Sequence, residues 1–237
     1  MRPMFFIPSF NDQLGLPQMV QALLGAFPQA RVLVVDDGSS PPIALAPADQ
    51  DCSDRAKLLR LEFNSGLGLV SSVAMDYFMQ SDCDVLLRLD ADGQHPIAEI
   101  EGLLGPLSEG AADVVLGERS NHMAMYSPRQ LMSSVTKQST AWVGQKIFRS
   151  PVMDWYTGFF AINREAAAVA ARAHLERYCE VQLLCLFHCS KLRIVTHSIE
   201  QLERVHGKST IGWSAGVMIF LRSTLTMVLY ALRMHPR

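Results

Sequence analysis

The sequence has too few cysteines, in the wrong arrangement, for a disulfide scaffold or a zinc ribbon. There are five, an odd number, and no two of them form a CxxC pair. Cys185, His188 and Cys189 could be drawn as a metal cluster. We interpret them instead as core positions on one helix of a reduced, cytosolic protein.

An excess of charge of either sign is also missing. The formal net charge is −2 and charged residues make up 19% of the chain, so bulk electrostatics gives no reason to expect nucleic acid as a partner. Hydrophobic residues make up 49% of the 237 positions, which is enough to bury a substantial core in one large domain or two merged halves.

No apolar run is long and uninterrupted enough to predict a membrane-spanning helix. The opening MRPMFFIPSF is too short and too soon broken by proline to act as a signal peptide. Near the C-terminus, Ile211–Met234 is strongly apolar but contains Arg222, which costs about 2.5–3.5 kcal/mol at the centre of a span. Arg222 and Arg233 are about three turns apart and share a helix face. We expect a helix docked on the protein or lying in a membrane interface, and a cytoplasmic protein that is peripheral on the cytoplasmic membrane face.

What the sequence does contain is a series of short apolar runs that alternate with helix-like segments. Continuous apolar runs of this length suit strands buried on both faces of a parallel sheet. Strands alternating with helices predict an α/β fold in which helices flank a mostly parallel sheet. The expected strands are Met4–Phe10, Arg31–Val35, Lys57–Phe63, Asp84–Leu89 and Asp113–Leu116, and the expected helices are Gly15–Phe27, Gly68–Met79 and Ile97–Leu107.

The pattern changes after Gly117, where the chain becomes less regular. We expect helices over Arg129–Phe148, Ala166–His174 and Val181–Cys189, followed by a strand in LRIVTHSIEQ. Residues 41–55 hold three prolines and read as a surface loop or irregular crossover. The predicted organisation is one domain over 1–210, with halves 1–120 and 121–210, and a terminal apolar helix over 211–237.

Polar residues gather where each of the five expected strands ends. In an open parallel sheet, ligands bind outside the carboxyl ends of the strands. Each group alone also suits a turn or a helix cap, but five such groups at one edge predict a binding site. The groups are Pro8–Asp12, Asp36–Ser40, Asn64–Gly68, Asp90–His95 and Gly117–Arg119.

Two aspartates, Asp90 and Asp92, stand one residue apart in the turn LDADGQHP. Carboxylates that share a site repel each other, and one of them binds a proton unless a cation lies between them. A hard divalent ion prefers such oxygen ligands and completes its shell with substrate phosphate oxygens. The pair therefore predicts a Mg²⁺ or Mn²⁺ site beside a diphosphate.

These segments resemble a known family. IPSFND is similar to the IPxYNE opening of the GT-A, family 2 glycosyltransferases, and VVDDGSS, NSGLG, LDADGQHP, GER and DWYTGFFAINR match its later motifs in order. The branch it resembles most is that of the polyprenyl-phosphate (dolichyl-phosphate) mannosyl- and glucosyltransferases, whose ERxxGxSK segment is echoed by ERVHGKST from Glu203. The resemblance covers about residues 4–210.

The resemblance implies a metal-dependent, inverting hexosyltransferase of cell-envelope polysaccharide synthesis. It would move a sugar from a nucleoside-diphosphate sugar to a lipid phosphate or a glycan, and 211–234 could contact the membrane. The implied nucleotide-sugar residues are Pro8, Phe10, Asp12, Asp36, Asp90 and Arg119, the metal residues Asp90, Asp92 and Gln94, and the catalytic residues Asp92, Asp154 and Arg204. Asp154 would act as base if the acceptor is a hydroxyl.

Three positions depart from the family pattern, and two other functions compete. Phe10 replaces a tyrosine, Asp12 a glutamate, and Thr210 a lysine, which leaves room for a relative that binds nucleotide sugar without transferring it. LLRLDADG also resembles the nucleophile motif of haloacid-dehalogenase phosphatases, although that motif usually lies on the first strand. A nicotinamide dehydrogenase is disfavoured because PSFND, and not GxGxxG, follows the first strand.

Overall fold

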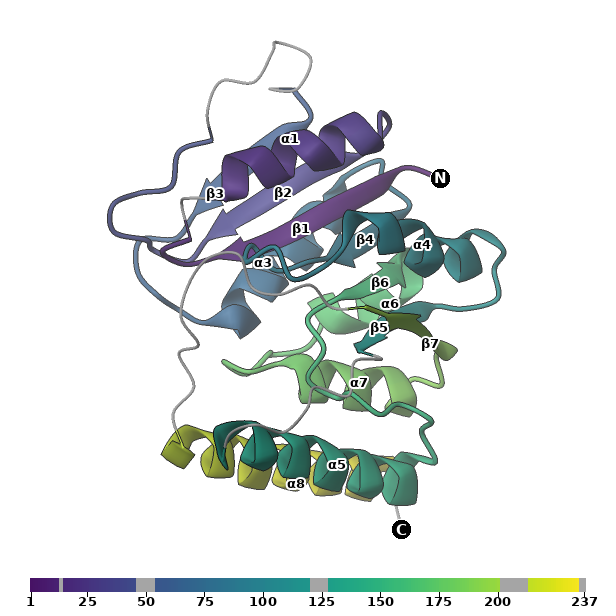
Figure 1. Ribbon diagram of the computed structural model, residues 1–237. Coiled ribbons are helices and arrows are strands. Elements are labelled where there is room, and N and C mark those ends of the chain that lie inside the picture. Colours follow the sequence, from purple (N-terminus) through teal and green to yellow (C-terminus); the bar gives the residue numbers. More distant parts are fainter. Residues whose placement is uncertain (13–14, 46–53, 120–127, 201–212, 235–237) are drawn as a thin grey trace.

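The apolar runs of the sequence pair into one seven-stranded sheet in a computed structural model that describes residues 1–12, 15–45, 54–119, 128–200 and 213–234 (Figure 1). The strands are β1 (Pro3–Ser9), β2 (Arg31–Asp36), β3 (Ala56–Arg60), β4 (Val85–Arg88), β5 (Val114–Arg119), β6 (Phe160–Asn163) and β7 (Ile194–Ile199). The helices are α1 (Leu16–Ala26), α3 (Leu67–Gln80), the short 3₁₀ helix η1 (Ile97–Glu99), α4 (Ile100–Ser108), α5 (Pro128–Phe148), α6 (Arg164–Ala171), α7 (Glu180–Cys189) and α8 (Trp213–Met234).

The strand order is β3-β2-β1-β4-β6-β5-β7, and only β6 runs against its neighbours. β1 pairs in parallel with β2 and β4, and β5 pairs in parallel with β7. Because β6 is antiparallel, its amino end lies at the same edge as the carboxyl ends of β4 and β5. This single reversed strand brings the segment before Phe160 to the edge where the sequence predicted a binding site.

Two cores cover the two faces of the sheet, as the alternation along β1 requires. Phe5 and Ile7 pack with α1 and α4, whereas Met4 and Phe6 pack in the core built with α3, α6 and α7. All four side chains are fully buried. Burial on both faces explains why the strands read as continuous apolar runs in the sequence.

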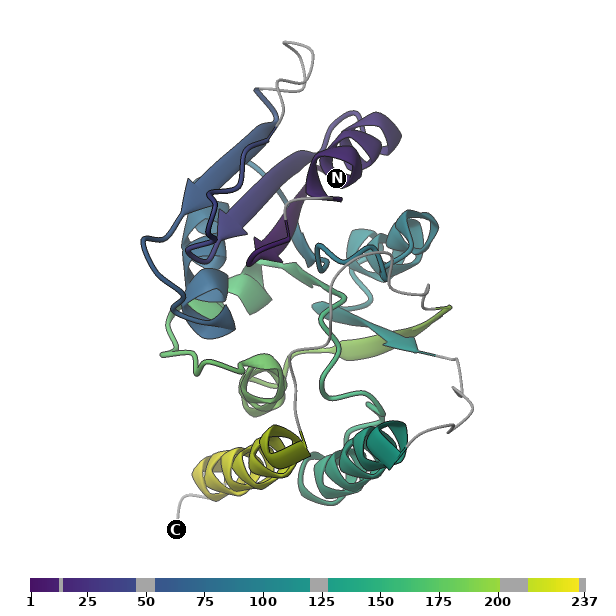
Figure 2. The same cartoon turned by 60° about the vertical axis from the view of Figure 1, so that its left-hand side comes forward.

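The helices α5 and α8 lie side by side in an outer layer, away from the sheet (Figures 1 and 2). α8 also packs on α7, through Met227 at the inner side of the helix. None of the helices in the described ranges combines the length and the apolarity that crossing a bilayer requires. The expected terminal helix is present, and it is docked on the protein.

The predicted fold class, a mostly parallel α/β sheet flanked by helices, is confirmed. The five expected N-terminal strands are present, although the third and fourth are shorter than predicted, and the strand expected in LRIVTHSIEQ is β7. β6 was missed, because four residues are too few to show a strand period. Of the five cysteines, Cys83, Cys179, Cys185 and Cys189 lie in described segments and are free thiols, as expected.

Candidate active site

The end of β1 turns sharply and is tied to the loop that follows β2. Asn11 has a φ of +57°, a conformation that asparagine tolerates better than most residues. The Asn11 N–H donates to Ser39 Oγ at 2.8 Å. Phe10 is 47% exposed, and Pro8 and Asp12 are partly exposed. All three predicted nucleotide-binding residues of β1 therefore lie at the surface of this edge.

Asp36 and Asp37 both bind backbone N–H groups near the carboxyl end of β2. Asp36 is fully buried and accepts from the Ser39 N–H at 2.9 Å and from Arg60 Nη1 at 3.2 Å. Asp37 accepts from the Gly66 N–H at 2.9 Å, where α3 begins. The capping role that these residue types allow is therefore present, and the predicted contact of Asp36 with a base or ribose remains a prediction.

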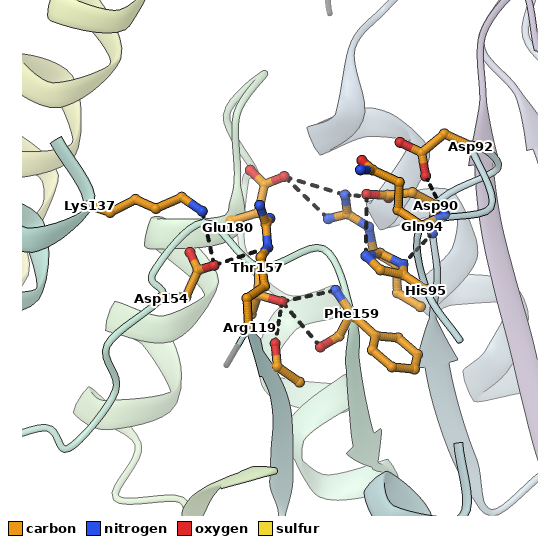
Figure 3. A network of polar contacts seen from close by, with 12 residues as sticks. Asp90, Asp92, Gln94, His95, Arg119, Lys137, Asp154, Thr157, Phe159 and Glu180 are labelled. Carbon is orange, nitrogen blue, oxygen red and sulfur yellow. Dashed lines mark hydrogen bonds and ion pairs between the residues drawn. The ribbon is translucent and has the colours of Figure 1, made fainter. Parts of the chain in front are cut away.

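The loop after β4 presents the predicted metal-binding side chains. Asp92 Oδ1 accepts from the Gln94 N–H at 3.1 Å, and Gly93 between them has a φ of +75°, which favours glycine. The Asp90 N–H donates to His95 Nδ1 at 2.9 Å, and the His95 ring stacks on Phe159. Figure 3 shows Asp90, Asp92 and Gln94 projecting from this one short loop.

The buried Arg88 forms an ion pair with Asp90. The sequence analysis did not predict this partner. Arg88 is 3% exposed, and its Nη2 lies 3.1 Å from Asp90 Oδ1 and 3.4 Å from Glu180 Oε1. The argument for a metal assumed that two carboxylates in one turn need a cation. For Asp90, Arg88 already is that cation, so the metal prediction rests chiefly on Asp92. The sequence could have revealed this ion pair, because an arginine inside the apolar run VLLRL is expected to be buried and to need an acidic partner.

A second ionic cluster forms where β5 ends and α5 passes. The Asp154 side chain is 8% exposed, and its Oδ2 lies 3.3 Å from both Arg119 Nε and Lys137 Nζ. Asp154 Oδ1 accepts from the Tyr156 N–H at 3.2 Å. Two cations thus share one carboxylate (Figure 3), and a second acid, Glu118, accepts from the Asp154 N–H at 3.2 Å.

The segment before β6 packs directly against the Asp90 loop. A Cβ at Gly158 would lie 2.6 Å from Asp90 Oδ2 and 3.0 Å from Arg88 Nη2, so only glycine fits there without displacing these groups. Thr157 Oγ1 donates to the Gly117 carbonyl at 2.8 Å, which fastens this segment to β5. The chain therefore holds the two ionic clusters next to each other.

The electrostatics of the edge favour the ionised form of Asp90. Burial is the largest single cause and raises the pKa of the Asp90 carboxyl, but Arg88, His95 and Arg119 together lower it further, so the net shift is downward. Burial lowers the pKa of the His95 imidazole, which fits a neutral ring whose Nδ1 accepts a hydrogen bond. Burial also lowers the pKa of Lys137, against the opposing effect of Asp154.

The structure brings nine of the ten predicted site residues to one edge of the sheet. Pro8 and Asp36 lie near the ends of β1 and β2, and Phe10 and Asp12 lie just after β1. The two ionic clusters and their loop hold Asp90, Asp92, Gln94, Arg119 and Asp154. Arg204 lies outside the described residues, as do Lys208 and Thr210. Arg88, Lys137 and Glu180 were missed. Arg88 ends β4, two residues before Asp90, whereas Lys137 and Glu180 join the site from positions far along the chain.

The loop after β4 fits a hard divalent cation through Asp92 and Gln94. Both offer oxygen donors on a partly exposed loop, which is the chemistry that Mg²⁺ and Mn²⁺ prefer. Among the described residues, no group of three or more His, Cys, Asp and Glu side chains is placed to hold a metal. An ion here would accordingly draw on amide and phosphate oxygens besides the carboxylates.

Comparison with known proteins identifies the family. The fold is that of a GT-A glycosyltransferase. The model of the family described as "Glycosyl transferase family 2" matches residues 4–169, more than half of the sequence, and the chain belongs to this family.

The relatives include enzymes of polyprenyl-phosphate chemistry. Polyprenol monophosphomannose synthase of Mycolicibacterium smegmatis is 35% identical over 121 residues, which are 50% of this chain and 45% of that protein. Undecaprenyl-phosphate mannosyltransferase of Micrococcus luteus is 33% identical over 122 residues, 50% of this chain and 49% of that protein. The matched region thus spans about half the length of each relative.

Solved structures agree on the fold. Glucosyl-3-phosphoglycerate synthase from Mycobacterium tuberculosis, crystallised with Mn²⁺, UDP and phosphoglyceric acid, superposes with a TM-score of 0.62 at 14% identity. The superposition covers 98% of this chain and 78% of that one. At this level of identity, the likeness establishes the GT-A fold alone.

Proposed function

We propose that this chain transfers a sugar from a nucleoside-diphosphate sugar to a polyprenyl phosphate, with inversion at the anomeric carbon. The observation that carries the proposal is the meeting of the Asp90–Gln94 loop with the cationic cluster of Arg119 and Lys137 at one edge of the sheet. The relatives named above, which act on polyprenol and undecaprenyl phosphate according to their names, support the choice of acceptor.

The donor would lie across the ends of β1, β2 and β4. Pro8, Phe10 and Asp12 would line the base and ribose, on an edge that Asp36 and Asp37 hold rigid. Asp92 and Gln94 would hold a divalent cation, with Asp90 beside it. Such an ion, when bound, supplies positive charge that stabilises the departing diphosphate. The mycobacterial synthase crystallised with Mn²⁺ and UDP supports this arrangement for the fold.

The acceptor side favours an anionic nucleophile. Arg119 and Lys137 face Asp154 from two elements, and guanidinium and ammonium groups are good donors to phosphate. A phosphate oxygen of the acceptor attacks the anomeric carbon while the bond from that carbon to the diphosphate oxygen breaks. The attacking oxygen is already ionised, so no base is required. Asp154 then holds the two cations in place, and it would act as base only for a hydroxyl acceptor. Arg204 would add to the phosphate contacts.

The outer helix layer would place this edge beside a membrane surface. α8 carries a row of apolar side chains on the side away from the core, each more than half exposed: Met218, Leu221, Leu225, Leu229 and Leu232. α5 adds Trp142, which is 61% exposed. Neither helix contains an acidic residue, whereas together they contain five basic ones. Apolar and basic groups on one layer suit an anionic lipid surface.

Incubation with a polyprenyl phosphate and either GDP-mannose or UDP-glucose, with Mn²⁺, tests the proposal. We expect a lipid-linked sugar phosphate by mass spectrometry, the opposite anomeric configuration by NMR, and loss of the product with EDTA. Binding of the sugar nucleotide with no transfer to any lipid or glycan acceptor would instead indicate a binding protein. Release of phosphate from simple phosphomonoesters would favour the phosphatase alternative, which family membership already disfavours.

A further inference from the structure

A buried chain of ion pairs runs beneath the Asp90 loop and joins it to α7. The last residue of β4, Arg88, donates to Asp90 Oδ1 at 3.1 Å through Nη2. Its Nη1 and Nη2 each lie 3.4 Å from Glu180 Oε1. Glu180 is the first residue of α7, and its side chain is only 16% exposed. The loop that carries the predicted metal site is thus fixed to a helix 92 positions further along the chain (Figure 3).

We propose that Arg88 and Glu180 are positioning residues that hold the Asp90 carboxylate toward the donor and leave Asp92 as the carboxylate that faces the metal. This role rests on the proposed function, because it concerns the same donor site. The groups that it adds, Arg88 and Glu180, are not among the residues that the family resemblance implies.

Charge supports this division of tasks. One guanidinium serves two carboxylates, Asp90 and Glu180, so it stays cationic although it is buried. A divalent ion bound at Asp90 Oδ1 would lie close to that guanidinium and be repelled by it. Asp92 Oδ1 instead accepts from the Gln94 N–H at 3.1 Å. A divalent ion is therefore better placed at Asp92.

Geometry shows that the two carboxylates set the orientation of the guanidinium. Among the described residues, Arg88 Nε has no hydrogen-bond partner. The guanidinium therefore forms its hydrogen bonds through the terminal nitrogens, and its carbon lies 5.8 Å from the centre of the Phe160 ring. Gly158 closes the other side of the site, since a Cβ there would lie 2.6 Å from Asp90 Oδ2. Loss of Glu180 would free the guanidinium to turn, and loss of Arg88 would leave two carboxylates that repel each other.

The test compares four variants with a matched control. Arg88→Met and Glu180→Gln each remove one partner, and Arg88→Lys keeps the charge but not the two-pronged geometry. The double variant Arg88→Met, Glu180→Gln removes both charges, so it avoids leaving Glu180 buried without a cation. Arg164→Met is the control: Arg164 donates to the carbonyls of Met79, Ser81 and Cys83, away from the loop.

Calorimetry below the unfolding temperature measures the binding of UDP, GDP, UDP-glucose and GDP-mannose in the presence of Mn²⁺. Electron paramagnetic resonance measures the binding of Mn²⁺ alone. We expect sugar-nucleotide Kd to rise ~10-fold, about 1.4 kcal/mol, in Arg88→Met, Glu180→Gln and the double variant. Arg88→Lys should bind more tightly than Arg88→Met. Mn²⁺ affinity should not fall in any of them, because all keep Asp92, and sugar-nucleotide Kd should change by less than ~2-fold in Arg164→Met.

Three results separate the positioning role from the proposed function. A folded double variant that binds sugar nucleotide like the wild type would overturn the positioning role and leave the proposed function intact. An equal loss of affinity in Arg164→Met would overturn it as well, because the effect would then follow from stability alone. A wild-type protein that binds neither UDP nor GDP with Mn²⁺ would overturn the proposed function, and this role with it.

Discussion

At the scale of single residues, the site depends on how each carboxylate is partnered. Asp90 is paired with Arg88, Asp154 with Arg119 and Lys137, and Asp92 caps the turn to Gln94. Because hydrogen bonds and charges differ at each carboxylate, the same side chain can serve as a metal ligand, an anchor or a donor contact. Substitutions of one residue at a time can therefore separate these tasks.

Asp92→Asn is expected to weaken Mn²⁺ binding ~10-fold or more, about 1.4 kcal/mol, and to abolish metal-dependent transfer. The amide oxygen can still accept the Gln94 N–H, so the turn should persist while the anionic ligand is lost. Mn²⁺ titration by electron paramagnetic resonance and product formation measure the two effects. Asp76→Asn, on the exposed side of α3, is the control. Unchanged Mn²⁺ binding in Asp92→Asn would contradict the metal assignment.

Gly158→Ala is expected to destabilise the fold by about 1–3 kcal/mol through overpacking and to weaken sugar-nucleotide binding. The new Cβ would lie 2.6 Å from Asp90 Oδ2 and must push that carboxylate aside. Gly25→Ala in α1 is the matched control, since a Cβ there meets nothing within 4 Å; it should gain about 0.5–1 kcal/mol from helix propensity. Urea unfolding and calorimetry distinguish the two. Equal effects of both changes would rule out the crowding at Asp90.

At the scale of elements, one carboxylate connects three strands at the edge of the sheet opposite the candidate site. Asp113, just before β5, accepts from Arg193 Nη2 at 2.8 Å and from Asn163 Nδ2 at 2.9 Å, so it links the adjoining ends of β5, β6 and β7. The hydrogen bond from the Arg193 side chain is the main cause that lowers the pKa of Asp113 to about 2. The strand β5 and its two neighbours, β6 and β7, therefore share one contact that acid would weaken.

The pH dependence of unfolding follows from the sign of that shift. The folded-state pKa is depressed, so Asp113 contributes stability above its ordinary pKa near 3.8, and this contribution is lost as pH falls from about 4 to about 2. Asp113→Asn should lower the free energy of unfolding by about 1–3 kcal/mol near neutral pH and flatten its fall below pH 4. Urea unfolding at several pH values measures this. A variant that keeps the full acid-induced fall would show that other carboxylates cause it.

At the scale of the whole molecule, the sheet edge and the helix layer of α5 and α8 are connected through Lys137. This residue belongs to α5, yet it lies 3.3 Å from Asp154 at the candidate site. The same layer carries the exposed apolar row of α8. The surface proposed to contact lipid thus borders the side of the site proposed to receive the acceptor.

Binding to vesicles tests this arrangement. The protein should co-sediment with vesicles that contain phosphatidylglycerol more than with phosphatidylcholine alone, because the layer is basic. The triple variant Leu221→Gln, Leu225→Gln, Leu229→Gln should lose most of this binding, since each buried leucine is worth roughly 1.5–3 kcal/mol. Leu69→Gln, an exposed leucine of α3, is the control. A triple variant that instead changes only the oligomeric state would assign the row to a contact between copies.

The sequence by itself determined six of the seven strands, their order of appearance and the polar groups at the ends of the first five. These follow from local patterns: buried strands read as apolar runs, and Asp90, Asp92 and Gln94 lie within five residues of one turn. The family resemblance rests on the same local segments, which the family match over residues 4–169 then confirmed.

Only the tertiary structure decided which distant side chains meet. Arg88 reaches Glu180 across 92 positions, the antiparallel β6 carries Gly158 to Asp90, and α5 brings Lys137 to Asp154. Such contacts depend on how strands are ordered and helices packed, and no local period encodes them. The physical reason is that a buried charge is stable only beside a group of opposite charge. The sequence indicates that such a partner is required, and the tertiary structure determines which residue it is.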